Sequence, residues 1–576
     1  MAELADRLAQ VTLSPLATVD SLFEDDATTS TLRDRFTAHL TAAGVVSETL
    51  PVLDARSYAS GAAPPQSLVR LVGMVQDMGN NEIYLPSMFS SRAGRACTMF
   101  RDNAPEGAVM DDEPSFDDRR PLYVVAAPGL QPWAAVRGAR AARAAAPAAS
   151  AAKRPRSDDG GGDDDADPGP KKAAAGAAPM DAAADARAAP GGGARGLECV
   201  VRVYGPSVPK LNDLVEFVGV LGGSPTAEPA SAGASALEGG PDDLDDYAMQ
   251  ELEDDSAWDP PLSRVARLHC VSYRVLDEWY PRGGGADMSP SDAEAARGDV
   301  LDVLAAALGG DRAAAEYCLY ALCAKTEKRH ATKVVGAFSL NLQCVARSGA
   351  YAAALAAALG LVAPRVVTLR TSDATAPLRS AGSDKLPPSH LQLPKGTVVV
   401  VDVDGAPPDS PGAHAAIRAI AGLLGDEKRV PYNYGFMEQQ VDADFPSFLV
   451  SGVETGGIDC DCVLPLSPEA PPCEVLLDDA RLDRARDYVA RSRSLRVAID
   501  DGAASDLEDQ YLAARATGKI SQAAAEKRLD AWVAVSKLHA KSLGDDKLAP
   551  KHWNAVFTLE GERARRLAVL ERAARP

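Results

Sequence analysis

The sequence predicts a multi-domain α/β protein, with an N-terminal β domain and a C-terminal α/β domain built on a parallel sheet. The chain has 576 residues, 46% of them hydrophobic, and this length allows roughly two to four domains. From Ser67 the apolar residues alternate, which is typical of half-buried strands. From Leu262 strand patterns alternate with helix patterns, and this alternation favours a parallel sheet.

Composition and periodicity divide the chain into seven segments. They are an N-terminal helical segment (1–60), the first part of the β domain (61–133), an Ala/Gly/Asp-rich insert (134–197), the second part of the β domain (198–222), an acidic linker (223–261), the α/β domain (262–475) and a C-terminal helical region (476–576). The insert and the linker have few large apolar side chains. Neither can offset its ordering entropy by burial, so we expect both to be disordered.

Local signals place the elements within these segments. Leu32, Phe36 and Leu40 recur at helical spacing and predict a helix that packs through one face. The turn signal at 79–81 separates two strand patterns, so the β domain should be a small barrel or sandwich that the insert interrupts. Patterns of helical period cover the last hundred residues or so, which predicts a helical end to the chain.

The insert contains a basic cluster in two parts. Its members are Lys153, Arg154, Arg156, Lys171 and Lys172. A flexible basic cluster can lie extended in the acidic groove of an import receptor, so we expect a nuclear-import signal and a nuclear protein. The alternative is a chance basic patch in a linker.

The strongest strand signal is the run Lys-Gly-Thr-Val-Val-Val-Val-Asp-Val-Asp-Gly, which is typical of a strand buried on both faces. It ends at Asp402 and Asp404, in the manner of a Walker B strand, whose acids hold Mg²⁺ in nucleotide triphosphatases. The phosphate loop that such an enzyme needs, Gly-x-x-x-x-Gly-Lys-Ser/Thr, does not follow the strand that starts near Lys333. We therefore expect no catalytic residues, no cofactor and no enzyme. Two alternatives remain: an unorthodox nucleotide site at these acids, or acids that cap the strand or meet a neighbour's basic residue.

Charge and cysteine usage exclude further classes. The net charge of −21 disfavours binding to phosphate backbones, so we expect no direct sequence-specific DNA binding. No apolar run approaches the roughly 20 residues of a membrane helix, and the N-terminus lacks the apolar core of a secretory signal. The nine cysteines suit reduced, buried thiols. Cys460 and Cys462 are spaced Cys-x-Cys, and a zinc site there is the weaker alternative.

Several strings of the sequence resemble the minichromosome-maintenance-complex-binding protein family. The matching strings are Ser67–Met78, with its Met-Val-Gln-Asp-Met, the stretch that ends at Trp133, Lys210–Leu221, Leu308–Leu322, Val334–Leu342, Leu391–Asp402, Tyr432–Pro446 and the tail Lys-His-Trp-Asn-Ala-Val-Phe. They follow one another in the family's order and cover most of the segments expected to be ordered. The stretch from Cys460 to Ala490 departs from the family pattern, which puts any family contact there in doubt.

The resemblance implies a fold and a function. The fold would combine a partial oligonucleotide-binding (OB)-like barrel with a degenerate AAA+/MCM-like domain and a helical lid, in which Ser536 and His539 stand where an arginine would reach a neighbour's nucleotide. The partners would be subunits of the MCM replicative helicase, and the chain would help to detach the complex from chromatin, with possible roles in subunit chaperoning and sister-chromatid cohesion. The alternative is a single-stranded nucleic-acid-binding module that uses the OB-like domain.

The sequence leaves the contact residues open. Tyr432, Tyr434, Phe436 and Trp553 are candidate interface anchors, because aromatic side chains dominate many interfaces. The alternative is that all four belong to the core.

Overall fold

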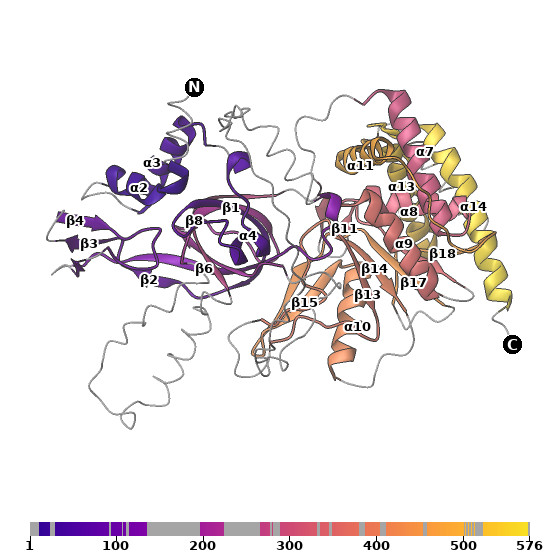
Figure 1. Cartoon of the computed structure of the whole chain (residues 1–576). Coiled ribbons are helices and arrows are strands. Elements are labelled where there is room, and N and C mark those ends of the chain that lie inside the picture. Colours follow the sequence, from indigo (N-terminus) through magenta and orange to yellow (C-terminus); the bar gives the residue numbers. More distant parts are fainter. Residues whose placement is uncertain are drawn as a thin grey trace, which may run out of the picture.

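The computed structural model describes two halves that lie side by side, a β-rich N-terminal half and an α/β C-terminal half (Figure 1). The described residues are 11–23, 29–45, 47–90, 94–105, 107–110, 114–134, 196–223, 265–276, 279, 288–330, 334–344, 348–379, 386–403, 411–452, 458–499, 522–573 and four single residues between 501 and 521. Within these residues no helix is both long and apolar enough to cross a membrane.

Short helices cover one side of the N-terminal half. They are α2 (Pro15–Leu22), α3 (Thr29–Ala42), the 3-10 turn η1 (Ser47–Thr49) and α4 (Ala55–Ala59). The predicted packing face of α3 is confirmed, because Leu32, Phe36 and Leu40 are buried in one apolar cluster with side chains of the adjacent barrel. Asp54 begins α4 by accepting a hydrogen bond from the backbone N–H of Ser57, as an N-cap residue does.

Five strands close into a barrel. They are β1 (Leu68–Met78), β6 (Asp117–Val125), β7 (Cys199–Tyr204), β8 (Leu214–Leu221) and β9 (Ala266–Val275), paired in the order β1-β8-β9-β7-β6 with a further pairing of β6 to β1. Only the β7–β9 pair is parallel. Alternate side chains of these strands, such as Val69, Val201 and Phe217, fill the interior. The barrel is thus closed and filled by apolar residues.

Strand β9 corrects the expected organisation of the chain. The sequence analysis assigned residues from 262 onward to the α/β domain and expected a partial barrel, but β9 pairs with β7 and β8 and completes the barrel. The physical reason is that β7 and β8 would otherwise each present an unpaired edge. Periodicity reveals a strand but not its partners, so the acidic linker looked like a boundary between domains.

A small extension projects from the barrel. Strand β2 (Glu82–Tyr84) pairs with β6, and a three-stranded sheet follows, built from β3 (Ser87–Ser90), β4 (Gly94–Cys97) and β5 (Ala108–Val109). In Figure 1 this extension lies at the end of the molecule that faces away from the α/β half.

The α/β half is built on a five-stranded parallel sheet, which confirms the predicted parallel arrangement. Its strands are β12 (Ser339–Gln343), β13 (Val366–Arg370), β14 (Val398–Asp402), β17 (Ser447–Ser451) and β18 (Cys462–Pro465), in the order β13-β14-β17-β12-β18. The four valines of β14 are all fully buried, as their uninterrupted run predicts.

Helices cover both faces of this sheet. Helices α8 (Arg312–Cys323) and α9 (Ser348–Val362) pack on one face, with α7 (Pro290–Ala307) and α11 (Asp479–Ser494) packed against them, and α10 (Pro411–Leu424) covers the other face. Two short hairpins complete this half, β10 (Lys328–Arg329) with β11 (Val334–Val335) and β15 (Arg429–Asn433) with β16 (Glu438–Asp442).

The end of the chain is helical, as predicted. Helices α13 (Gln522–Leu543) and α14 (Pro550–Ala573) pack on each other, and α14 also lies against the edge strand β18. A buried ion pair fixes α14, since Arg566 Nη1 lies 2.6 Å from Asp311 Oδ2. The same carboxylate accepts hydrogen bonds from the backbone N–H groups of Ala314, at the start of α8, and Ser467, so it joins three segments.

The two halves meet through hydrogen bonds at two contacts. The backbone N–H of Val366, at the start of β13, donates to the carbonyl of Gly129 (2.9 Å), and Trp133 Nε1 donates to the carbonyl of Gly360 (2.8 Å). At a second contact between the halves, the side-chain amide of Asn212, beside the barrel, donates a hydrogen bond to the Tyr432 hydroxyl (2.7 Å). The first two contacts anchor the segment after β6 to the edge strand β13 and to Gly360 in the following helix of the α/β half.

We predict that Asp311→Ala lowers the free energy of unfolding by about 3 kcal/mol, because it leaves Arg566 without its buried partner and removes the cap of α8. Chemical denaturation monitored by circular dichroism measures this loss. The control is Asp302→Ala, which breaks a half-exposed pair with Arg312 and should cost less than about 1 kcal/mol. Equal losses in the two variants would contradict the assignment.

Candidate functional site at the carboxyl edge of the parallel sheet

The carboxyl ends of β12, β14 and β17 form the edge at which α/β proteins commonly bind ligands. Asp402 ends β14 and is only 5% exposed. It lies against the start of α9, because a Cβ atom placed on Gly349 would be 3.3 Å from Asp402 Oδ2. A carboxylate there is favoured by the positive end of the helix dipole. The chain thus supplies its own anion at the helix start.

Two other polar side chains near this edge, among the residues that the structure describes, are paired with each other. The Ser451 hydroxyl, at the end of β17, donates to Asn341 Oδ1 of β12 (2.9 Å), and both side chains are buried. Burial, with a contribution from the Asp402 charge, raises the pKa of the Cys344 thiol to about 12, so this thiol stays protonated. The connection from β12 to α9 reads Cys-Val-Ala-Arg-Ser and lacks the Gly-Lys-Ser/Thr of a phosphate loop.

Several predicted residues lie outside the described part of the chain. Asp404 falls in 404–410, and the whole basic cluster from Lys153 to Lys172 falls in 135–195. Of the basic cluster and the two Walker-B-like acids, the structure describes Asp402 alone, at a buried strand end beside α9.

The structure separates the four candidate aromatic anchors. Tyr432 is buried at the junction of the two halves, and Trp553 is buried edge-on against Trp532 in the helical region. Tyr434 is half-buried, whereas Phe436 is 80% exposed between β15 and β16. Three of the four thus contribute to packing, and Phe436 alone of them is fully available at the surface.

Of the Cys-x-Cys pair, Cys462 is buried and Cys460 is partly buried. Burial is the main cause that raises the pKa of both thiols, Cys460 and Cys462, to about 12, so both are thiols rather than thiolates near neutral pH. Among the described residues no group of three or more His, Cys, Asp or Glu side chains is arranged to hold a metal ion. A zinc ligand is a thiolate, and these positions disfavour that form.

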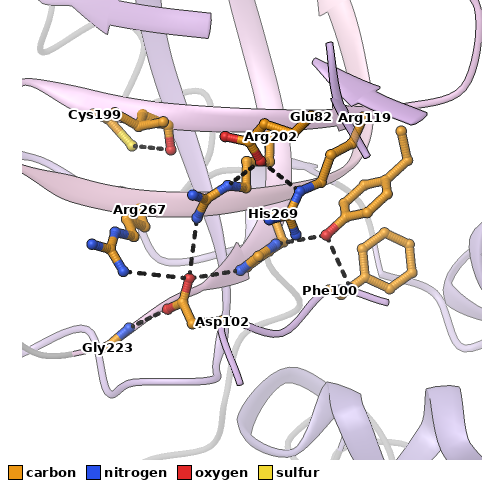
Figure 2. Close-up of polar contacts among 11 residues, drawn as sticks. Glu82, Phe100, Asp102, Arg119, Cys199, Arg202, Gly223, Arg267 and His269 are labelled. Atoms are coloured by element: carbon orange, nitrogen blue, oxygen red, sulfur yellow. Dashed lines mark hydrogen bonds and ion pairs between the residues drawn. The ribbon is translucent and has the colours of Figure 1, made fainter. Parts of the chain in front are cut away.

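A second polar cluster, which sequence reasoning did not identify, lies on the outer side of the barrel (Figure 2). Asp102, in the loop between β4 and β5, accepts hydrogen bonds from His269 Nε2 (3.1 Å), Arg202 (3.4 Å) and the backbone N–H of Gly223 (3.1 Å). Arg202 Nε also donates to Glu82 of β2 (3.0 Å). The residues of this polar cluster lie up to 187 positions apart in the sequence (from Glu82 to His269), so no local spacing pattern marks them.

The tautomer of His269 follows from these partners. Because Nε2 faces a carboxylate, it carries the proton, and Nδ1 accepts a hydrogen bond from the Tyr204 hydroxyl (2.7 Å). That hydroxyl in turn accepts from the backbone N–H of Phe100 (3.3 Å). Each group in this series of hydrogen bonds, from Asp102 to the backbone N–H of Phe100, has a partner. The cluster therefore joins the extension to the barrel rather than presenting a reactive atom.

The same cluster bears on the nucleic-acid alternative. Single-strand-binding barrels offer exposed aromatic side chains and basic groups to bases and phosphates. Here Arg119 and Arg202 both donate to Glu82 Oε2, at 2.7 and 3.0 Å, and Tyr204 is buried beneath the N-terminal helices. These two arginines of β6 and β7 are thus engaged within the protein.

We predict that stability falls as the pH is lowered from about 7.5 to about 5.5, partly through His269. Burial lowers the pKa of His269 below its ordinary value, so the unfolded chain binds a proton that the folded chain rejects. The loss is at most about 1.4 kcal/mol per pH unit for one proton. Denaturant unfolding of His269→Gln should show a flatter pH dependence, whereas His39→Gln on the exposed face of α3 should leave it unchanged. A wild-type slope in His269→Gln would contradict this.

Comparisons with known proteins place the chain. A protein from Arabidopsis thaliana named "Mini-chromosome maintenance complex-binding protein" is 26% identical over 553 residues, covering 90% of each chain. Relatives of the same name from Drosophila melanogaster and Homo sapiens are 24% identical, and the matches cover 88% and 65% of this chain and 91% and 62% of the relatives. The family model described as "Mini-chromosome maintenance replisome factor" matches residues 36–567. This match spans most of the sequence, and the chain therefore belongs to that family.

Proposed function

We propose that this chain is a non-catalytic regulator of DNA replication that binds subunits of the MCM replicative helicase. The observation that carries the proposal is the family match over residues 36–567, whose relatives bear the name of complex-binding proteins. The names of the relatives state that they bind the complex. The mechanism by which this chain would act on the complex is our inference from the fold.

The fold supports subunit mimicry. A five-stranded closed barrel followed by a five-stranded parallel sheet suits an OB-like domain joined to a degenerate AAA+/MCM-like domain with a helical lid. Asp402 lies beside the start of α9, where an active ATPase would hold phosphate. The chain would thus offer the surfaces of a helicase subunit without a competent nucleotide site.

Mimicry gives a mechanism for disassembly. A protein that binds a subunit more tightly outside the ring than within it lowers the concentration of free subunits. By mass action, this shifts the equilibrium from the assembled ring toward dissociated subunits. Release from chromatin, chaperoning of new subunits and an effect on sister-chromatid cohesion are downstream consequences of such binding.

Nuclear import through the cluster from Lys153 to Lys172 would bring the chain to its partners. Mutation of that cluster to alanine should leave a tagged chain in the cytoplasm.

The rival role, a single-stranded nucleic-acid-binding module, has less support. The net charge is −21, and Arg119 of β6 and Arg202 of β7 are held by Glu82 and Asp102. Binding to a fluorescent oligonucleotide that weakens steeply with salt would favour this rival.

The decisive experiment mixes the purified full-length chain with purified MCM subunits, singly and as the assembled ring. We expect a stable complex by size-exclusion chromatography with light scattering, and a decrease in intact ring as the chain is added. An unrelated acidic protein of similar size is the control for charge. Failure to bind any subunit would overturn the proposal.

We further predict that the purified chain neither hydrolyses ATP nor is stabilised by it. Mg²⁺–ATP should not shift the thermal unfolding midpoint, because the connection from β12 to α9 lacks the lysine and the glycines that would neutralise and cradle the phosphates. Differential scanning fluorimetry and a phosphate-release assay measure the two effects. Hydrolysis that disappears in Asp402→Asn would restore the alternative of an unorthodox nucleotide site.

A further inference from the structure

A short segment after β6, residues 127–134, attaches the barrel half to the α/β half, and we call it the strap. Leu130 stands opposite Arg365 in an antiparallel bridge directly before β13, and the backbone N–H of Gln131 donates to the carbonyl of Pro364 (2.9 Å). β13 is an edge strand of the parallel sheet, and a sheet edge presents unpaired backbone groups. The strap therefore covers part of that edge.

The strap lies so close to β13 that it requires a glycine. Gly129 has a φ of +69°, and a Cβ atom there would lie 2.4 Å from the carbonyl oxygen of Val366 and 2.7 Å from Val367 Cγ2. Glycine adopts positive φ at little cost and has no Cβ atom to collide. The carbonyl of Gly129 is thereby free to accept the hydrogen bond from the Val366 N–H (2.9 Å). Any larger residue at this position would push the strap away from the sheet.

Trp133 fixes the far end of the strap. Its Nε1 donates to the carbonyl of Gly360 in α9, and the guanidinium carbon of Arg486 in α11 lies 4.1 Å from the centroid of its ring. Arg486 is itself held, because its Nε donates to the carbonyl of Leu361 (2.8 Å). A cation over the face of an indole ring is attracted to it. Trp133 is thus held by a directional hydrogen bond and by a stacked cation.

The Gln-Asp of the Met-Val-Gln-Asp-Met string makes a second attachment. The pairing of β1 with β6 shifts register between Val75 and Asp77, so Gln76 has no counterpart in β6, as in a β-bulge. Asp77 Oδ2 accepts a hydrogen bond from the backbone N–H of Leu386 (2.7 Å). The carbonyl of Gln76 accepts one from the side-chain amide of Gln392 (3.2 Å). Both side chains of the string are buried, so the α/β half covers this part of β1.

The two attachments lie on opposite faces of the parallel sheet. The strap meets α9 and α11, whose apolar side chains pack in the cluster on one face. Leu386 belongs to the cluster on the other face, the one that α10 covers, and so does Tyr432, which accepts the hydrogen bond from Asn212. A single attachment would let the halves rotate about it, whereas attachments on both faces fix their orientation. Domains of one chain move relative to each other by default, and these contacts remove that freedom.

We propose that the strap and the Gln76–Asp77 attachment clamp the barrel to the α/β half in one orientation, and that an MCM subunit recognises the two halves in that orientation. The second clause rests on the proposed function. A mimic of a helicase subunit has to present its barrel and its α/β surfaces together. Halves that are clamped before binding lose less entropy on binding. The clamp thus serves binding by preorganisation, without touching the partner.

The strap is tested in the full-length chain with Gly129→Ala. Its matched control is Gly61→Ala, because Gly61 has a φ of +68° but no atom within 4 Å of its Cβ position, so the control carries the backbone strain without the collision. We expect hydrogen exchange in peptides that cover residues 129–134 to accelerate about tenfold or more in Gly129→Ala and to stay within about twofold of wild type in Gly61→Ala. Trp133→Ala, which adds no backbone strain, should accelerate exchange in the same peptides. Wild-type exchange in both strap variants would overturn the clamp.

Spin labels measure the orientation of the halves. Cys473 is exposed in the α/β half, and Arg56→Cys adds an exposed label site in α4 on the barrel half. Double electron–electron resonance should give one narrow distance distribution for the otherwise wild-type chain. The double variant Asp77→Ala, Trp133→Ala, which weakens both attachments, should broaden it about twofold or more. A distribution that is equally broad in both proteins would overturn the clamp.

Binding to purified MCM subunits is measured with the same variants by biolayer interferometry. We expect Asp77→Ala, Trp133→Ala to raise Kd about fivefold or more, because the halves must then be ordered on binding, and Gly61→Ala to change Kd less than about twofold. Thermal unfolding checks that each variant is folded. Wild-type Kd in a double variant with a broadened distance distribution would overturn recognition of the clamped orientation and leave the proposed function standing. No binding by the wild-type chain would overturn the proposed function, while exchange and spin-label distances would still decide the clamp.

Discussion

The fold of the N-terminal half depends on strand β9, which is hydrogen-bonded along one edge to β7 and along the other to β8. Both partner strands precede β9 in the sequence, and the acidic linker separates them from it. Its parallel pairing with β7 and antiparallel pairing with β8 turn an open sheet into a closed barrel. The same strand supplies Arg267 and His269 to the cluster around Asp102. The barrel and the cluster therefore both depend on the two non-local pairings of this strand.

A second constraint shapes the α/β half. Asp402 ends a strand whose four valines are fully buried, so its position is set by the core and cannot adjust freely. The core places this carboxylate beside the start of α9, where a helix dipole favours negative charge. This edge of the sheet thus carries a negative charge that the protein itself supplies.

The net negative charge and the ion-paired arginines distinguish between a protein partner and a nucleic-acid partner. Arg119 and Arg202, which stand on the barrel strands, are held by Glu82 and Asp102 within the protein. A nucleic-acid partner needs the opposite distribution, with free cations and exposed aromatic rings. The surface chemistry accordingly favours a protein partner, which agrees with the family to which the chain belongs.

Local patterns in the sequence determined what depends on neighbouring residues. The packing face of α3, the buried run of β14, the parallel sheet, the helical end and the lack of a Gly-Lys-Ser/Thr loop follow from spacing and residue type, because helix and strand periods repeat within a few residues. Only the tertiary structure decided which strands pair with β9, that Asp402 meets Gly349, and that Phe436 is exposed while Tyr432 is buried. These relations join residues far apart in the chain, and the packing of whole elements selects them, so no local pattern contains them.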